Sequence, residues 1–267
     1  MIFYKCQANQ NDFIFIEKKF NVSFSSLAKK FCHRRSSIGA DGLVTYSIKK
    51  PYYFRFYNPN GQESAMCGNA LISYPALLNY LGIKLSKKIG IKTATGLREL
   101  TILEKKKCMI QSILDMEQPS FKPQEISKYM IQNSMKDYPL TILDRTFMCN
   151  FVSLGNPHCV IFVDETVDIE TYGPLIENHP LFSEKINVEF VQIKSRNELS
   201  VDFWERGAGH TYSCGSGSCA AFVVALQKKL CNSSVHINKK TTSIQTLSKN
   251  NHVFIKSTGY FVFEGKI

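Results

Sequence analysis

An internal repeat restricts the possible folds of this chain more than any other feature of its sequence. Residues 56–70 align without a gap with residues 203–217. In both segments a strand-like run leads through a glycine-bearing loop to a Cys-Gly pair, Cys67-Gly68 or Cys214-Gly215, and then to an apolar stretch. Such self-similarity is typical of a chain built from two copies of one structural unit.

A second pair of similar segments precedes the first. Residues 11–16 and 156–163 each read as an asparagine-bearing turn that enters a β-rich run, and they are offset by nearly the same number of residues. We therefore predict an N-terminal half over residues 1–117, joined by the C-terminal strand 258–267, and a C-terminal half over residues 118–257.

Hydrophobic periodicity predicts one principal helix in each half. Apolar side chains recur at helical spacing over Leu71–Leu81 and over Cys219–Leu230, which places each Cys-Gly pair at or just before a helix N-terminus. The remaining chain reads mainly as strands, which include Tyr52–Tyr57, Val160–Val163, Glu189–Ile193 and Val253–Ile255. The sequence thus predicts an α+β protein with two domains.

Composition narrows the class of protein further. The chain has 267 residues, of which 44% are hydrophobic, and this is enough to bury a substantial core. It carries a formal charge of +11, but its lysines form short runs without interleaved aromatic residues or a nucleic-acid motif. We interpret them as a solvated surface and expect no nucleic-acid partner.

The cysteines and the apolar segments indicate the cellular compartment of the protein. Nine cysteines are scattered without the dense spacing of a disulfide framework, and no stretch has the length and apolarity of a membrane span or a signal peptide. We expect reduced thiols in the cytoplasm and no membrane contact. No Cys-x-x-Cys pair is present, so we expect no zinc site, and no phosphate-binding or dinucleotide fingerprint indicates a cofactor.

Cysteines at helix starts can carry chemistry. A helix N-terminus favours the thiolate, so Cys67 or Cys214 could act as a base near neutral pH. The amides that follow each cysteine, at Gly68-Asn69 and Gly215-Ser216, are predicted to point outward at a helix start, which suits a carboxylate. If the two halves face one cleft, one thiol could remove a proton from one face of a carbon while the other returns a proton to the opposite face.

Each thiol needs a neighbour that sets its protonation state. The repeat pattern offers His158, in an Asn-Pro-His turn, and Glu205, nine residues before Cys214. The other seven cysteines are interpreted as small buried hydrophobic residues, because this is the usual role of a free cysteine.

At these residues the sequence resembles the diaminopimelate epimerases. The matching stretches are Asn11-Asp12-Phe13, 38–42, Asn58, Met66-Cys67-Gly68-Asn69, 155–159, 187–190, Glu205-Arg206-Gly207-Ala208-Gly209 and Cys214-Gly215-Ser216-Gly217. Together these stretches span nearly the whole chain in one order.

The resemblance implies interconversion of LL- and meso-diaminopimelate without a cofactor, on the path to lysine and peptidoglycan. It implies that Cys67 and Cys214 form the acid and base pair and that His158 and Glu205 tune them. It also implies a set of residues that grip the amino-acid substrate: Asn11, Asn58, Gly68, Asn69, Asn156, Asn187, Glu205, Arg206, Gly215 and Ser216. Arg206 fits this role because a guanidinium holds a carboxylate through two parallel hydrogen bonds.

The resemblance further implies two similar domains, each a β-barrel-like mixed sheet around a central helix, and a homodimer that uses the C-terminal strand. The sequence departs from the family pattern at Ala70, Ile72, His210 and Phe263. None of these is a proposed acid or base, but changes around a helix-start pocket can alter substrate preference.

Three alternatives stay open on the sequence. A two-cysteine racemase of glutamate, aspartate or proline would keep the fold and the mechanism. A nucleic-acid-binding protein would show salt-dependent binding that does not need the cysteines. An inactive scaffold would neither bind nor turn over a substrate.

Overall fold

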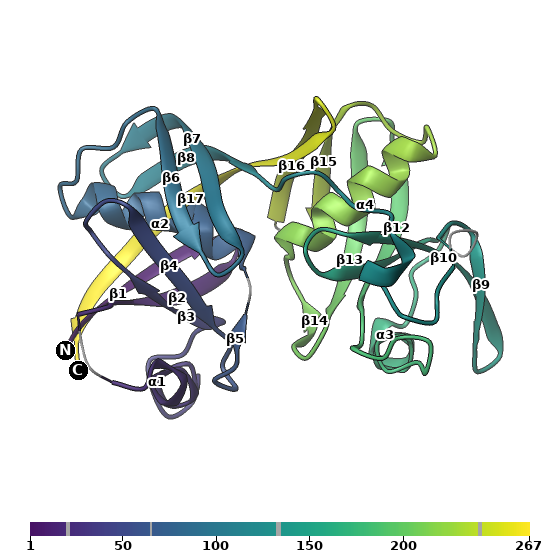
Figure 1. Cartoon of the computed structure of the whole chain (residues 1–267), viewed down its shortest axis with the longest axis horizontal. Helices are drawn as coiled ribbons and strands as arrows, with labels where there is room; N and C mark the ends of the chain where they lie inside the picture. The colour runs from purple at the N-terminus through teal and green to yellow at the C-terminus, as the bar shows by residue number, and fades with distance from the viewer. Residues whose placement is uncertain (20–21, 65, 132–134, 240–241) are drawn as a thin grey trace. The chain divides into compact units, whose positions relative to one another are not determined.

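The computed structural model describes residues 1–19, 22–64, 66–131, 135–239 and 242–267. The chain divides into two compact units (Figure 1). Unit 1 consists of Met1–Asp115 and Lys256–Ile267, and unit 2 consists of Met116–Ile255. The last strand therefore starts in unit 2 and ends in unit 1.

Unit 1 is a closed barrel of eight strands. Its strands are β1 (Ile2–Ala8), β2 (Asn11–Glu17), β3 (Gly42–Tyr46), β4 (Tyr52–Tyr57), β6 (Lys88–Thr93), β7 (Gly96–Lys106), β8 (Met109–Asp115) and β17 (His252–Lys266), and a short β5 (Glu63–Ser64) pairs with β4. Each strand pairs with the next in this order, and β17 pairs with both β8 and β1. The pairings β2–β3 and β4–β6 are parallel. The pairings β1–β2, β3–β4, β4–β5, β6–β7, β7–β8 and β1–β17 are antiparallel.

The central helix of unit 1 is α2 (Gly68–Tyr80), and a smaller helix, α1 (Phe24–Phe31), contacts β3 and β4. Every residue of α2 from Gly68 to Leu78 is buried, and the helix contacts β1, β2 and β8. A helix that is apolar on all sides can be stable only where neighbours surround it, which explains its place inside the barrel.

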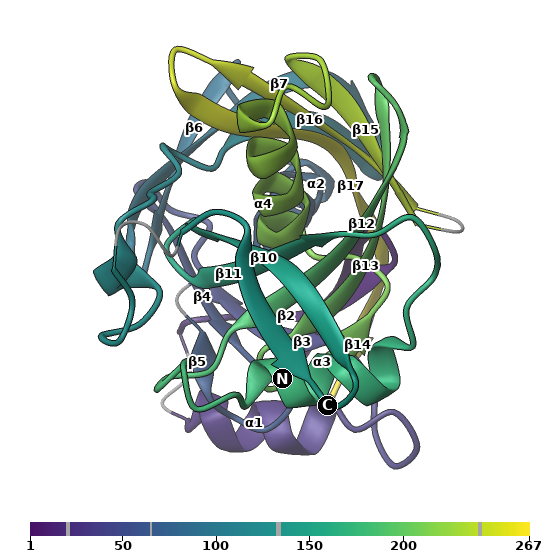
Figure 2. The same ribbon diagram turned by 90° about the vertical axis from the view of Figure 1, so that its right-hand side faces the viewer.

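Unit 2 repeats this arrangement. Its elements are a 3-10 turn (Pro123–Glu125), β9 (Tyr138–Ile142), β10 (Arg145–Ser153), β11 (Pro157–Phe162), α3 (Ile169–Glu177), β12 (Asn187–Ser195), β13 (Glu198–Glu205), β14 (Gly209–Thr211), α4 (Gly215–Gln227), β15 (Ser234–Lys239) and β16 (Thr242–Lys249). Helix α4 is buried over most of its length and lies among the strands of its unit (Figure 2).

The strand pairings confirm the repeat. Both units contain the same series of strand pairings, which are antiparallel, parallel, antiparallel and parallel in turn. In unit 1 the series is β1–β2, β2–β3, β3–β4 and β4–β6, and in unit 2 it is β10–β11, β11–β12, β12–β13 and β13–β15. Helices α2 and α4 each have 13 residues and follow equivalent strands. The predicted α+β class and the two similar barrel-like halves are therefore confirmed.

The sequence predicted the principal helices and the strands, although their limits differ slightly. Both helices begin earlier than their apolar periodicity, at Gly68 and Gly215, directly after the cysteines. Helices α1 and α3 were not predicted; they are short, with eight and nine residues. Among the described residues no helix has the length and apolarity that crossing a membrane requires.

Candidate active site

Each predicted catalytic cysteine is the N-cap residue of its unit's central helix. Cys67 has φ −134° and ψ 110°, and Cys214 has φ −129° and ψ 119°, so both have the extended backbone of a residue that enters a helix. The first amides of α2 and α4 have no partner within their helices, and their positive end favours an anion. The two cysteines thus have the same backbone setting in the two units.

In unit 1 a chain of amide side chains connects the start of α2 to the barrel. Nδ2 of Asn69 donates to Oδ1 of Asn11 at 2.5 Å, and Nδ2 of Asn9 donates to Oδ1 of Asn69 at 2.8 Å. Nδ2 of Asn11 in turn donates to Asp41 at 3.1 Å, and Ser257 donates to Asn9 at 2.7 Å. The two predicted substrate-binding asparagines, Asn11 and Asn69, therefore hold each other in fixed orientations.

A charged cluster supports this chain from the barrel end. Arg34 bridges the carboxylates of Asp12 at 2.6 Å and Asp41 at 2.5 Å, and Lys5 lies 2.8 Å from Asp12. Burial alone would raise the pKa of Asp12, but the hydrogen bonds from Arg34 and Lys5 outweigh it and lower this pKa. Asp41 in turn accepts the hydrogen bond from Asn11, and the sequence did not indicate a role for this cluster.

Asn58, Cys67 and Gly68 are the other predicted site residues of unit 1. Asn58 follows β4 directly, and a turn fixes its backbone, because its amide donates to Gln62 at 2.9 Å and its carbonyl accepts from Gly61 at 2.8 Å. The side chain of Asn58 is half-buried, whereas Gly68 is buried at the helix start. Cys67 itself is partly exposed.

In unit 2 Cys214 lies beside Glu205. Cys214 is 5% exposed, and its Sγ accepts a hydrogen bond from the amide of Gly217 at 3.3 Å. Glu205 ends β13 and accepts a hydrogen bond from Thr211 Oγ1 at 2.6 Å. Burial raises the pKa of Glu205, although hydrogen bonds from Thr211 and Cys214 oppose this rise. The predicted pairing of Glu205 with Cys214 thus has a geometric basis.

His158 lies deeper in unit 2 and is fully buried on β11. Its Nε2 is 3.1 Å from Oδ1 of Asn156, and Nδ2 of Asn156 donates to Ser216 Oγ at 3.5 Å. Nδ1 of His158 is 2.7 Å from Oε1 of Glu189, which is a buried carboxylate on β12. His158, Asn156 and Ser216 were predicted as site residues, whereas Glu189 was placed in a strand and in the matching stretch 187–190 without a role of its own.

The loop that carries Arg206 is fixed from three sides. The amide of Arg206 donates to Oδ1 of Asn187 at 2.9 Å, and Nδ2 of Asn187 donates to the carbonyl of Pro157 at 2.8 Å. Glu177 on α3 accepts from Trp204 Nε1 at 2.7 Å and from the amide of Gly207 at 3.0 Å. Arg206 is exposed, its Nη1 donates to the carbonyl of Glu184 at 3.0 Å, and Glu177 was not predicted.

The thiol of Cys214 is held in its protonated form. Burial raises the pKa of Cys214 well above that of an ordinary thiol, and the carboxylates of Glu205 and Glu189 raise it further. Hydrogen bonds from Ser216 and Gly217 act in the opposite direction without reversing the shift. Cys214 therefore rests as a thiol that can donate a proton.

Alkylation tests this difference between the two cysteines. Because iodoacetamide reacts with the thiolate and must reach the sulfur, we expect the partly exposed Cys67 to be modified at pH 7 before the buried, protonated Cys214. Mass mapping of the two peptides over time measures both rates. Faster labelling of Cys214 would contradict the assigned protonation state.

The predicted site residues therefore form two sets, one in each unit. Unit 1 holds Asn11, Asn58, Cys67, Gly68 and Asn69, and unit 2 holds Asn156, His158, Asn187, Glu205, Arg206, Cys214, Gly215 and Ser216. Within the described ranges no group of three or more His, Cys, Asp and Glu side chains is arranged to hold a metal ion.

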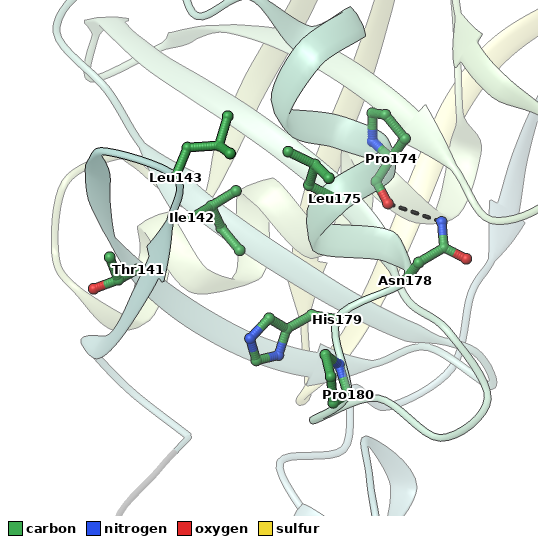
Figure 3. Close-up of a pocket in the computed structure, with 8 residues that line it drawn as sticks. All are labelled: Thr141, Ile142, Leu143, Pro174, Leu175, Asn178, His179 and Pro180. Carbon is green, nitrogen blue, oxygen red and sulfur yellow. Dashed lines mark hydrogen bonds between the residues drawn. The ribbon is translucent and has the colours of Figure 1, made fainter.

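A hollow of about 510 Å³ on unit 2 is a separate feature (Figure 3). Its lining comes from the end of β9 with Leu143 and from the end of α3 with the segment 178–180 that follows it, which includes His179. None of the predicted site residues contributes to this hollow.

Comparison with known proteins identifies the fold first. Solved structures with this fold include a PhzF-family phenazine biosynthesis protein of Bacillus anthracis, with TM-score 0.70 and 12% identity over 100% of this chain and 98% of that one. A probable proline racemase of Agrobacterium radiobacter matches with TM-score 0.69 and 12% identity over 100% of this chain and 92% of that one. The chain thus has the paired-barrel fold that these proteins share.

Sequence comparison then identifies the family. The family model described as diaminopimelate epimerase matches residues 3–122 and 150–261. The diaminopimelate epimerase of Moorella thermoacetica is 32% identical over 99% of this chain and 98% of its own length. That of Carboxydothermus hydrogenoformans is 41% identical over 84% of this chain and 83% of its own length. The chain belongs to the diaminopimelate epimerase family, as the sequence motifs predicted.

Proposed function

We propose that this chain is an isomerase that interconverts LL- and meso-2,6-diaminopimelate by exchanging the proton on the α-carbon. The observation that carries the proposal is the pair of cysteines at equivalent helix N-caps of two repeated units, in a chain of this family. A single base cannot readily remove a proton from one face of a carbon and return one to the other face. Two cysteines supply the two bases without a cofactor.

The raised pKa of Cys214 sets the expected direction of the proton transfers. Because Cys214 carries its proton, we expect Cys67 to be the base that takes the α-proton of the LL substrate. Cys214 then gives its proton to the opposite face of the carbon. The reaction leaves Cys67 as a thiol and Cys214 as a thiolate, which is the state that runs the reverse reaction.

The helix starts supply the electrostatic part of the mechanism. Removal of the α-proton places negative charge on the substrate carbon and its carboxylate. The amides at Gly68-Asn69 and Gly215-Ser216 lie at the positive ends of α2 and α4, where they stabilise such charge. Because these donors are fixed before the reaction, they need no reorganisation in the transition state.

Arg206 binds a carboxylate of the substrate. Asn187 and Glu177 fix the loop around Arg206, and the exposed guanidinium donates from Nη1 to the carbonyl of Glu184 at 3.0 Å. We expect Arg206→Lys to raise KM by about ten- to a hundredfold, because an ammonium loses the two parallel hydrogen bonds worth roughly 1.5–3 kcal/mol. Steady-state kinetics measure this change. An unaltered KM would show that Arg206 does not contact the substrate.

Incubation with LL-diaminopimelate tests the proposed function. The reduced protein, with no added cofactor, is expected to form the meso isomer, which chiral chromatography separates from the substrate. A panel of glutamate, aspartate and proline serves as the comparison. Turnover of a panel member without turnover of diaminopimelate would indicate a racemase of a smaller amino acid, and no turnover at all would refute the proposal.

We further infer that the enzyme works as a homodimer in the cytoplasm, without nucleic-acid partners. Tyr260, Val262 and Phe263 near the C-terminal end of β17 are all more than a third exposed, so this strand offers an apolar surface to a second copy. Light scattering is expected to give twice the mass of the chain. A monomer at micromolar concentration would contradict this inference.

A further inference from the structure

Glu189 is a buried carboxylate that the proposed reaction has not used. It is 1% exposed, and its Oε1 lies 2.7 Å from Nδ1 of His158, which is 0% exposed. Within the described residues Oε2 of Glu189 has no hydrogen-bond partner. Burying a carboxylate with one unpaired oxygen is destabilising, so a residue of this kind is expected to have a compensating role.

Unit 1 shows that the fold does not require this pair. His158 lies opposite Asn187 in the β11–β12 pairing, and the equivalent β2–β3 pairing places Phe13 opposite Gly42. Two residues further along, Glu189 corresponds to Val44. Phe13 and Val44 are both buried and apolar, so the same register packs well without an imidazole or a carboxylate.

Contacts connect Glu189 to the sulfur of Cys214. Nε2 of His158 lies 3.1 Å from Oδ1 of Asn156, and Nδ2 of Asn156 donates to Oγ of Ser216 at 3.5 Å. Oγ of Ser216 in turn lies 3.5 Å from Sγ of Cys214. Helix α4 also packs directly on the carboxylate, because a β-carbon at Gly217 would lie 2.7 Å from Oε1 of Glu189. The carboxylate thus reaches the helix start that holds the thiol by two routes.

We propose that Glu189 is a positioning residue for proton exchange at Cys214, which acts by holding the imidazole of His158 with its Nε2 toward Asn156. This inference rests on the proposed function. The carboxylate accepts the hydrogen bond from Nδ1 and so fixes the ring within β11, and the ring fixes the substrate-binding asparagine beside Ser216. The equivalent positions in unit 1 are apolar, so only unit 2, which contains Cys214, has this carboxylate–imidazole pair.

The charge of Glu189 also acts on the thiol. The groups that face Cys214 are Glu205 on β13, Glu189 on β12, Ser216 and the amide of Gly217, and His158 on β11 interacts with Glu205. Both carboxylates raise the pKa of Cys214. A neutral side chain at Glu189 therefore lowers this pKa, and the thiolate forms at lower pH than in the wild type.

The test compares the wild type with Glu189→Gln, which keeps an oxygen acceptor but removes the charge. We expect kcat for LL-diaminopimelate to fall by about ten- to a hundredfold with KM changed less than about threefold, because a misplaced group affects the transition state more than binding. Alkylation of Cys214, measured against pH in the Cys67→Ala background, is expected to move to lower pH. Wild-type kcat together with an unchanged alkylation profile would overturn the proposal.

A double-variant cycle separates positioning from a general structural effect. His158→Phe with Glu189→Val recreates the Phe13 and Val44 pair of unit 1, so we expect it to fold, and circular dichroism checks this. If Glu189 acts through His158, Glu189→Val lowers kcat in the wild type but causes no further loss in the His158→Phe background. An equal loss in both backgrounds would contradict the proposal.

The two hypotheses fail in distinguishable ways. A wild type that does not invert diaminopimelate would refute the proposed function. The alkylation profile would still report whether Glu189 controls the thiol, because that measurement needs no substrate.

Discussion

Replacement of either cysteine by alanine is expected to abolish inversion of the substrate. Cys67→Ala and Cys214→Ala each remove one of the two groups that exchange a proton with the α-carbon. General acid and base groups contribute roughly 10²–10⁴-fold, and no neighbouring thiol can replace the one lost, so we expect kcat to fall by at least about a thousandfold. Chiral chromatography of the reaction mixture measures the residual rate.

Cys219 provides the matched control for these variants. It lies on α4 five residues after Cys214, is fully buried and has no assigned role. Cys219→Ala keeps helix propensity and changes little volume, so its activity is expected to stay within about twofold of the wild type. Inversion by either Cys67→Ala or Cys214→Ala at a rate near that of Cys219→Ala would contradict the two-base mechanism.

Gly259→Ala is expected to cause a large loss of stability in unit 1. Gly259 lies on β17 where the strand crosses the central helix, and an added β-carbon would overlap the carbonyl oxygen of Ile72 and Cα of Ser73. Because the obstacles are backbone atoms of α2, no side-chain rotation can relieve them. We expect a loss of about 3 kcal/mol in the free energy of unfolding, measured by urea titration.

Gly90→Ala is the control for this substitution. Gly90 lies on β6 of the same barrel, and an added β-carbon there would meet only the flexible side chain of Leu97, at 3.1 Å. We expect its free energy of unfolding to stay within about 1 kcal/mol of the wild type. Equal stability of the Gly259→Ala and wild-type proteins would show that β17 does not press on α2 as described.

The central helices and their cysteines could be predicted because the sequence signal is local and occurs twice. Apolar side chains surround both helices, and the Cys-Gly pairs precede them at equivalent positions, so the repeat marked Cys67 and Cys214 without any tertiary information. The division into two similar halves followed from the same repeat. The barrel form was implied only by the family resemblance.

Contacts between distant segments could not be predicted. Asp12, Arg34 and Asp41 meet only because the parallel β2–β3 pairing brings the ends of two strands together, and no spacing along the chain indicates this. A role for Glu189 could not be predicted, because its neighbours in the sequence are mostly apolar and typical of a buried strand. Comparison with Val44, its counterpart in the other half, is the signal that could have found it.

Deuterium incorporation tests the central claim most directly. The reduced protein is incubated with LL-diaminopimelate in deuterated water, and the α-carbon is examined in both isomers at low conversion. Two opposed bases predict that the meso product carries solvent deuterium while the recovered LL substrate retains its hydrogen, and that Cys67→Ala and Cys214→Ala form no product. Deuterium in the recovered substrate at the same rate as in the product would contradict the two-base account.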